Sequence, residues 1–357
     1  MVIQSSPFAQ ARHLQARLIG LCAVLILLGA CAAPAYYAQA AAGQWQLSRQ
    51  SRPVDAWLAD ETTSAETAER LELAQELLEF ATQKLALPAT DSYSSYAETG
   101  REAVTWIVVA APEFSLEPKT WCFLVAGCVP YRGYFDRDDA KRFADRMQGK
   151  GFDVSVSPTA AYSTLGWFDD PLVDSMFGSG EPDFAGTLFH EMAHQELYLP
   201  GDTLFSESYA AFVEELGVRL WLESRNGRAI FEKWLDKRAA KARVNKVLGE
   251  HRRQLGALYD EGLEPHVMRR QKAAILQGLC TSLGRKSSDD CDINNATLAL
   301  HRSYEGGHCA FARLYDETGR DIRRFHDASR AVSRWPAERR SAWLERPCNP
   351  VAPGHEL

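Results

Sequence analysis

The stretch TLFHEMAHQE (Thr187–Glu196) contains two histidines four residues apart, with a glutamate directly after the first. On a helix, His190 and His194 lie on one face, one turn apart, so both imidazoles can bind the same zinc ion. In H-E-x-x-H sites the glutamate takes a proton from the zinc-bound water, and Glu191 has that position here. The alternative is a helix that contains two histidines by chance. We expect a zinc site with Glu191 as its general base.

The residues around this stretch are typical of a buried helix. Asp183 is the expected N-cap, and Pro200 is expected to end the helix. The apolar side chains that would pack it into a core are Phe184, Leu188, Phe189, Met192 and Leu197.

A catalytic zinc site needs a third protein ligand and one open position. The pattern with a third histidine is absent, because Leu197 stands where its glycine would be. The segment FSESYAAFVEELG (205–217) offers Glu207 instead, and twelve residues separate it from His194, enough for a turn and a second helix running back. Glu214 would share a helical face with Glu207, two turns on. The alternative is that Glu207 belongs to a solvated, acidic start of a helix and binds no metal.

The N-terminus has the features of an export signal. Basic residues precede the apolar run Leu18–Leu28, which is shorter than a membrane-spanning helix. The run ends in LLGAC, which resembles the lipobox of bacterial lipoproteins, with cleavage before Cys31 and lipid attached to it. A plain signal peptide cut near Ala33 is the alternative. We expect residues 1–30 to be a signal peptide and 31–50 a lipidated tether, with acyl chains as the membrane anchor. By resemblance, the anchor lies in the outer membrane and the protein faces the periplasm.

The cysteine content agrees with export. Six cysteines remain once Cys22 leaves with the signal and Cys31 takes the lipid, and an even number in an oxidising compartment indicates disulfides. Zinc binding by cysteines is disfavoured because no C-x-x-C occurs. Six cysteines allow 15 pairings. Proximity in the sequence favours Cys122–Cys128, Cys280–Cys291 and Cys309–Cys348.

Composition and periodicity predict one α+β domain over residues 51–357, with a helix-rich C-terminal half. With 46% hydrophobic residues the chain can bury a sizeable core, and its net charge of -7 does not suggest a nucleic-acid partner. Strands are expected at Val104–Ala110 and Phe152–Ser157. Helices are expected at Thr63–Leu85 with Thr63 and Glu66 as a capping box, at Asp136–Gly151, from Ser206 to about Leu258, and at Asn294–Thr318 with a break at Gly306 and Gly307.

Several motifs resemble known zinc peptidases. FSESYAAFVEE looks like the W-L-N-E-G-F-A-x-Y-x-E segment of gluzincin aminopeptidases, in which the first glutamate is the third zinc ligand and a second acid follows seven residues later. Glu207 and Glu214 match both positions. Together with LLGAC, the segments WCFLVAGCVPYRGYFD, YSTLGWFDDP, TLFHEMAHQELY and NNA (294–296) resemble the family of putative bacterial aminopeptidases, exported lipoproteins. The resemblance covers nearly the whole mature chain and implies a zincin-like metallopeptidase core that binds zinc.

The sequence also departs from the better-known aminopeptidases. Ser206 replaces the asparagine before the third ligand, and Ala211 stands where the thermolysin-like pattern has an acid that contacts a ligand histidine. Glu214 is therefore the candidate for that contact. The G-x-M-E-N segment, which binds the substrate amine in those enzymes, is absent. A zinc peptidase is therefore better supported than an aminopeptidase.

Four further residues are candidates for a substrate pocket. Tyr304 and Tyr162 could donate to the oxyanion of the transition state, and a buried structural tyrosine is the alternative for each. Asp169 and Asp170 could line the pocket or bind a substrate amine, or could form a turn before Pro171. The other histidines lack ligand spacing to the centre.

The expected function is a zinc-dependent peptide hydrolase, of the aminopeptidase type that the resemblance implies, with a peptide as its substrate. Two alternatives remain: an envelope lipoprotein that holds zinc without catalysis, and an endopeptidase acting on envelope proteins.

Overall fold

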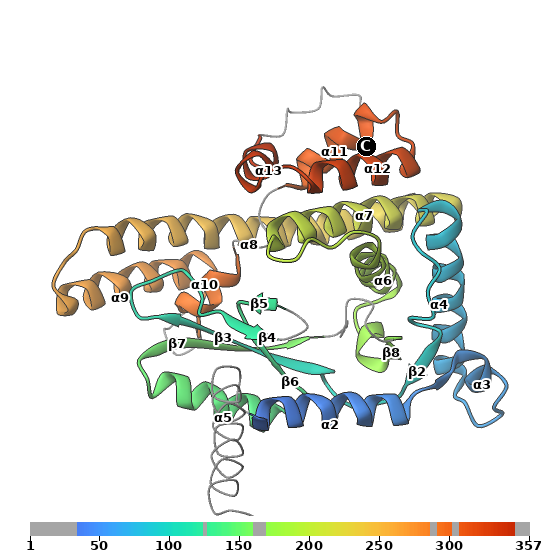
Figure 1. Cartoon of the computed structure of the whole chain (residues 1–357), viewed down its shortest axis with the longest axis horizontal. Coiled ribbons are helices and arrows are strands. Elements are labelled where there is room, and N and C mark those ends of the chain that lie inside the picture. Colours follow the sequence, from blue (N-terminus) through green and yellow to red (C-terminus); the bar gives the residue numbers. More distant parts are fainter. Residues whose placement is uncertain (1–33, 124–126, 160–168, 286–290, 302–306, 347–357) are drawn as a thin grey trace, which may run out of the picture.

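The computed structural model describes residues 34–123, 127–159, 169–285, 291–301 and 307–346. Helices predominate and the sheets are small, so the α+β class is confirmed (Figure 1). Among the helices described, none combines the length and the apolar character that crossing a bilayer requires.

The larger sheet is built on β3 (Thr105–Pro112), which pairs antiparallel with β6 (Arg132–Tyr134) and β7 (Phe152–Thr159). Alternate β3 side chains point to opposite faces, and helices cover both. Trp106, Val108 and Ala110 pack with α5 (Arg137–Gln148), whereas Val109 and Ala111 pack with α10 (Asn295–His301). Both expected strands are thus confirmed.

The other strands are short. β1 (Arg52–Pro53) pairs antiparallel with β2 (Ser95–Ala97), and β2 pairs parallel with β8 (Leu172–Val173). A 3-10 turn, Asp174–Phe177, then leads from β8 towards the helix that carries the histidines. β4 (Trp121–Phe123) and β5 (Gly127–Val129) form a separate hairpin, and α3 (Val54–Leu58) follows β1.

The main core lies among α4 (Ala65–Lys84), α6 (Glu181–Glu196) and α7 (Thr203–Ser224). α6 and α7 pack closely because Gly217 has no side chain: a Cβ there would lie 2.6 Å from the ring of Phe189. α7 runs back past α6, as expected: Glu207, near its start, lies against His194, whereas Gly217 lies against Phe189.

Two expected helix caps differ from the structure by a few residues. Ser64, not Thr63, caps α4 by accepting a hydrogen bond from the Thr67 N–H. Gly180 precedes α6, so Asp183 lies inside its first turn, where a carboxylate is favourable near the helix dipole.

The region expected to be one long helical stretch consists of two helices. α7 ends at Ser224, and α8 (Arg228–Asp260) starts after Gly227. α8 extends away from the main core and packs along its C-terminal half against α9 (Pro265–Ser282), as Figure 1 shows. A second hydrophobic cluster, which includes Leu248, Leu255 and Leu279, holds that pair together.

Three C-terminal helices pack on the side of α7 away from the sheet (Figure 1). They are α11 (His308–Glu317), α12 (Ile322–Ser333) and α13 (Ala337–Leu344). The expected helical stretch near the C-terminus is therefore divided between α10 and α11, and Gly306 lies outside the described residues.

The segment expected to be a tether after Cys31 forms a helix instead. α2 (Pro34–Gln50) packs on the domain: its Tyr36 ring lies 5.6 Å from that of Tyr134, and Leu47 is buried. Alanine is the strongest helix former and is frequent in this segment, a propensity that outweighs its linker-like composition. The expected tether over 31–50 is therefore wrong for the described part of that range.

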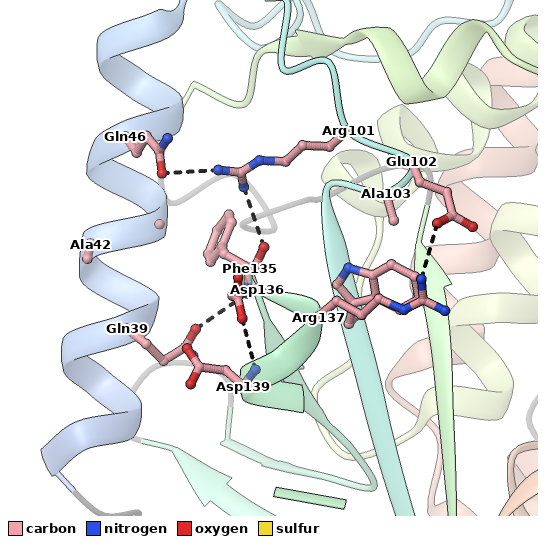
Figure 2. Close-up of a pocket in the computed structure, with 12 residues that line it drawn as sticks. Gln39, Ala42, Gln46, Arg101, Glu102, Ala103, Phe135, Asp136, Arg137 and Asp139 are labelled. Atoms are coloured by element: carbon pink, nitrogen blue, oxygen red, sulfur yellow. Dashed lines mark hydrogen bonds and ion pairs between the residues drawn. The ribbon is translucent and has the colours of Figure 1, made fainter. Parts of the chain in front are cut away.

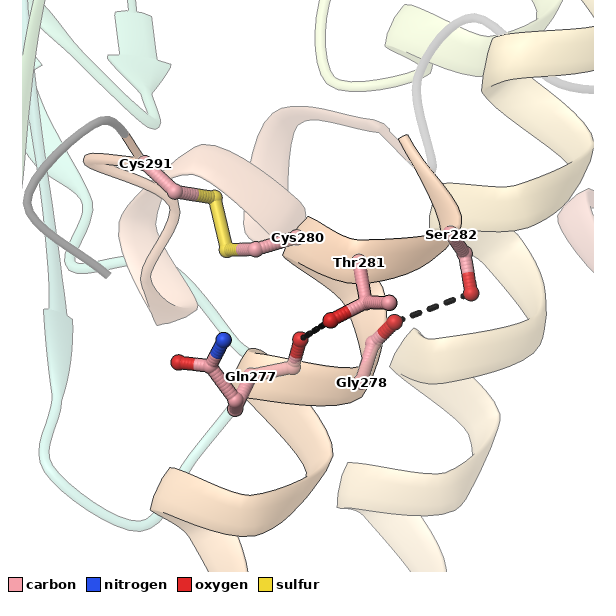
Figure 3. Close-up of a disulfide and its surroundings, with 6 residues drawn as sticks. All are labelled: Gln277, Gly278, Cys280, Thr281, Ser282 and Cys291. Carbon is pink, nitrogen blue, oxygen red and sulfur yellow. Dashed lines mark hydrogen bonds between the residues drawn. A yellow bond between two sulfur atoms is a disulfide. The ribbon is translucent and has the colours of Figure 1, made fainter. Parts of the chain in front are cut away.

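Two of the three expected disulfides are present. Cys122 and Cys128 close the β4–β5 hairpin, with Cα atoms 3.8 Å apart. Cys280, near the end of α9, is joined to Cys291, with Cα atoms 6.0 Å apart (Figure 3). Cys309 is also disulfide-bonded, but its partner lies outside the described residues, so the pair with Cys348 stays a prediction.

Candidate metal centre

α6 and α7 bring His190, His194 and Glu207 together, as their spacing in the sequence predicts. The Nε2 atom of His190 lies 3.4 Å from Glu207 Oε2, and that of His194 lies 3.6 Å from Glu207 Oε1. One donor atom from each residue lies within 4.8 Å of the other two. Three potential ligands from two neighbouring helices thus converge on one point.

The spacing of these donors fits a divalent metal. Zinc binds nitrogen and oxygen at about 2.0–2.2 Å with tetrahedral geometry, so two of its ligands lie ~3.4 Å apart. The two nitrogen-to-carboxylate distances, 3.4 and 3.6 Å, are close to that value. Among the described residues, two imidazoles and one carboxylate would hold the ion and leave the fourth tetrahedral position open, which is the arrangement of catalytic zinc sites.

Glu214 lies behind His190 and orients it. His190 Nδ1 is 3.1 Å from Glu214 Oε2, so the ring donates there while Nε2 points at Glu207. Glu214 in turn accepts a charge-assisted hydrogen bond from Arg238 of α8. A carboxylate behind a ligand histidine fixes its tautomer and raises its basicity.

His194 lacks a contact of that kind. Its Nδ1 is buried, and within the described ranges no group accepts a hydrogen bond from it. Its ring packs edge-on at 5.9 Å from that of Tyr198. Among the described residues, packing positions this imidazole, and no carboxylate does so.

The acids and bases of the centre have perturbed pKa values. Burial raises the pKa of Glu191 to about 7, and the nearby charges of Glu207, Asp170 and Glu214 act in the same direction, against His190. Burial also lowers the pKa of His194 to about 4, with His190 contributing. A carboxyl with a pKa near neutrality can exchange protons readily at physiological pH, as a general base must.

The pKa of His190 changes in the opposite direction to that of His194. Burial opposes a charge on its ring, but hydrogen bonds with Glu207 and Glu214 outweigh burial and raise its pKa to about 10. Burial likewise opposes the two carboxylates, yet hydrogen bonds with His190 lower the pKa of both. A cation at this point is therefore strongly favoured.

The remaining candidates from the sequence are only partly described. Tyr162 and Tyr304 lie outside the described residues. Gly307, just after the second of them, packs on Ser208 next to Glu207, since a Cβ there would lie 2.3 Å from Ser208 Oγ. Asp169 is exposed, whereas Asp170 is buried near Glu191.

The other described histidines do not join the centre. His251 contacts the carbonyl of Val247, and His308 lies 3.4 Å from Glu215. His326 is buried and bonded on both nitrogens, as a core histidine.

Two residues beside the centre could not be predicted from the sequence. Arg238 belongs to a basic run, from Lys233 to Lys246, of a kind that is typical of a solvated helix face. Only the path of α8 shows that it meets Glu214. Tyr198 keeps its proton, because burial and the charge of Glu207 raise its pKa. Its ring lies next to that of His194.

A cavity of about 480 Å³ lies elsewhere, between α2 and the start of α5 (Figure 2). Its wall includes Gln39, Gln46, Arg101, Phe135 and Arg137, and Figure 2 shows Arg101 reaching Gln46. None of the residues that line it belongs to the metal centre.

The fold and the site together define an α+β chain with a His–His–Glu cluster of the metal-binding kind. The chain belongs to the family described as "Putative aminopeptidase", whose model matches residues 35–344. Comparison with curated proteins and with solved structures found no match.

Proposed function

We propose that this chain is a zinc-dependent peptide hydrolase of the aminopeptidase type, with a zincin-like core and with His190, His194 and Glu207 as the metal ligands. The observation that carries the proposal is the convergence of these three side chains beside Glu191. The family description supports a peptidase. We further propose that residues 1–30 are an export signal and that lipid on Cys31 anchors the protein at the outer membrane, facing the periplasm.

Zinc held by His190, His194 and Glu207 would supply Lewis-acid chemistry for the carbonyl and the water. Glu191 accepts a proton from the attacking water while the new carbon–oxygen bond forms. It then passes that proton to the amine as the carbon–nitrogen bond breaks. Glu214 and Arg238 hold the His190 ring in the orientation that ligation needs.

The test uses the purified mature chain in three forms: wild type, Glu191→Gln, and the control Glu181→Gln at the exposed start of α6. We expect about one zinc per chain in all three by elemental analysis, with hydrolysis lost only in Glu191→Gln. Zinc that is bound in the wild type without turnover of any peptide would refute the enzymatic proposal.

A panel of matched free and N-acetylated peptides identifies the mode of cleavage. An aminopeptidase cleaves only the free peptides, because it needs the terminal amine. Cleavage of both sets would instead establish the endopeptidase alternative.

A further inference from the structure

The middle of α8 is solvated on every side. All six residues from Ala239 to Val244 are exposed. Six residues cover more than one full turn of 3.6 residues, so no other element covers the helix there. On either side of this exposed stretch, α8 is packed: Trp234 is buried in the main core, and Leu248 is buried in the cluster with α9. α8 is therefore a bridge between two packed bodies.

One face of this bridge points inward. Trp234, Arg238, Lys241, Asn245 and Leu248 follow one another at intervals of four, three, four and three, which places them on a single helical stripe. The stripe is buried at Trp234 and Leu248, and its Arg238 contacts Glu214 behind the metal ligand His190. Lys241 therefore lies on the same side of α8 as these residues, one turn from Arg238, and is exposed there.

Lys241 is a cation without a counter-charge. Residues 237–249 contain no aspartate or glutamate. Within the part of the chain that the structure describes, no carboxylate lies within 4.0 Å of Lys241. By contrast, its neighbours Lys237 and Arg238 are paired, with Asp183 and Glu214 respectively. An unpaired ammonium one helical turn from Arg238, which itself pairs behind His190, is placed to bind an anionic part of a ligand.

We propose that Lys241 binds an acidic side chain of the peptide substrate, at a position away from the scissile bond, and so makes acidic peptides preferred substrates. The proposal rests on the proposed function. Because Lys241 is exposed, its pair with a carboxylate is worth little more than ~1 kcal/mol, which corresponds to about two- to fivefold in kcat/KM. The preference must also weaken as salt is added.

The experiment compares peptides that differ only by Glu or Gln at successive positions away from the scissile bond. Wild type, Lys241→Gln and Lys241→Glu are assayed with Arg243→Gln as the matched control. Arg243 is exposed on the same turn but two residues on, which places it on the opposite face. Hydrolysis is measured at low and at high salt.

We expect wild type and Arg243→Gln to prefer one Glu peptide over its Gln partner by about two- to fivefold. Lys241→Gln should remove the preference, Lys241→Glu should reverse it, and the neutral peptide should be cleaved equally well by all four proteins. An unchanged preference in Lys241→Gln would overturn the proposal, as would a preference that follows amidation of the C-terminus instead of the acidic side chain.

A binding assay separates this proposal from the proposed function. The same peptide pairs, labelled with fluorescein, are titrated with Glu191→Gln protein with and without Lys241→Gln, so that no turnover is needed. Tighter binding of the Glu peptide that disappears with Lys241→Gln supports the assignment even if no peptide is hydrolysed. Equal binding of both peptides by both proteins counts against it.

Discussion

Arg238 of α8 and Glu214 of α7 form an ion pair directly behind His190. The guanidinium neutralises a partly buried carboxylate, which can then accept the Nδ1 proton of His190. The chain of contacts from arginine through carboxylate to imidazole joins three helices at the metal centre. The position of α8 therefore affects how firmly the His190 ring is held in its orientation.

Replacing Arg238 should weaken metal binding, although it touches no ligand. We expect Arg238→Gln to lower zinc affinity about tenfold, near the lower end of the effect of lost outer contacts. A titration against a chromophoric chelator measures this without any assay of activity. Arg243→Gln serves as control, and equal affinities of the two variants would show that the ion pair does not support His190.

Removing the carboxylate ligand should have a larger effect. Glu207→Ala deletes one of three donors, so its loss of zinc affinity should exceed the ~10–100-fold typical of outer contacts. Elemental analysis after dialysis should find little zinc, whereas the exposed α7 variant Glu223→Gln should retain it. Zinc at wild-type occupancy in Glu207→Ala would mean that another group is the third ligand.

Metal removal should destabilise the wild-type fold but not that of Glu207→Ala. Ligand present at a hundred times its Kd stabilises the folded state by ≈ 2.7 kcal/mol, so a chelator should lower the Tm of wild type measurably. Thermal unfolding followed by circular dichroism, with and without chelator, provides the comparison. If both proteins lose the same amount, the chelator acts at some site other than this centre.

His326 should make stability depend on pH. Its Nε2 donates to the carbonyl of Leu85, at 2.8 Å, so its Nδ1 accepts from the Tyr209 hydroxyl, at 2.7 Å. Burial lowers the pKa of His326 below 6.5, and Arg323 contributes, against the Leu85 carbonyl and Asp327. The unfolded state therefore binds the proton first, and stability is complete above pH 6.5 and is lost as the pH falls through the folded-state pKa.

Urea unfolding of wild type and His326→Gln between pH 5 and pH 8 tests this dependence. The variant should be less stable at pH 8, because it loses a buried hydrogen bond, and the difference should shrink as the pH falls. A difference that stays constant over this range would exclude His326 as the titrating group.

The Cys280–Cys291 disulfide should stabilise the α9 side of the molecule. It closes a loop of 11 residues, for which chain entropy predicts about 3 kcal/mol. We expect Cys280→Ala/Cys291→Ala to lose about that free energy of unfolding and to keep its zinc, because the ligands lie on α6 and α7. The pair Cys122→Ala/Cys128→Ala, with a separation of 6, is the control and should lose less. Loss of zinc from the first variant would contradict a purely local role.

Helical periodicity made much of the centre predictable. His190 and His194 meet because the helix repeat places residues four apart on one face, whatever the rest of the fold does. Glu207 and Glu214 follow from the same rule applied to the next helix. Short separations likewise predicted the Cys122–Cys128 and Cys280–Cys291 pairs, since sequence neighbours are seldom far apart in space.

Contacts between distant segments were not predictable in this way. Arg238 reaches Glu214 across 24 residues, through a path of α8 that no local pattern encodes. The cap is Ser64 and not Thr63, because two neighbouring hydroxyl residues can each cap the same helix start. The docking of α2 depends on a partner surface, formed by residues such as Tyr134, that its own sequence does not contain.

The absence of a side chain at Gly217 has a consequence for the choice of ion. Phe189, the residue before His190, lies against this glycine, so the glycine allows α6 and α7 to approach closely next to that histidine. A methyl group there would spread the two helices and enlarge the cage between them. The preference of the site for cations of a given radius would then depend on a residue that does not contact the ion. Position 217 is therefore the first to vary when a different metal specificity is sought.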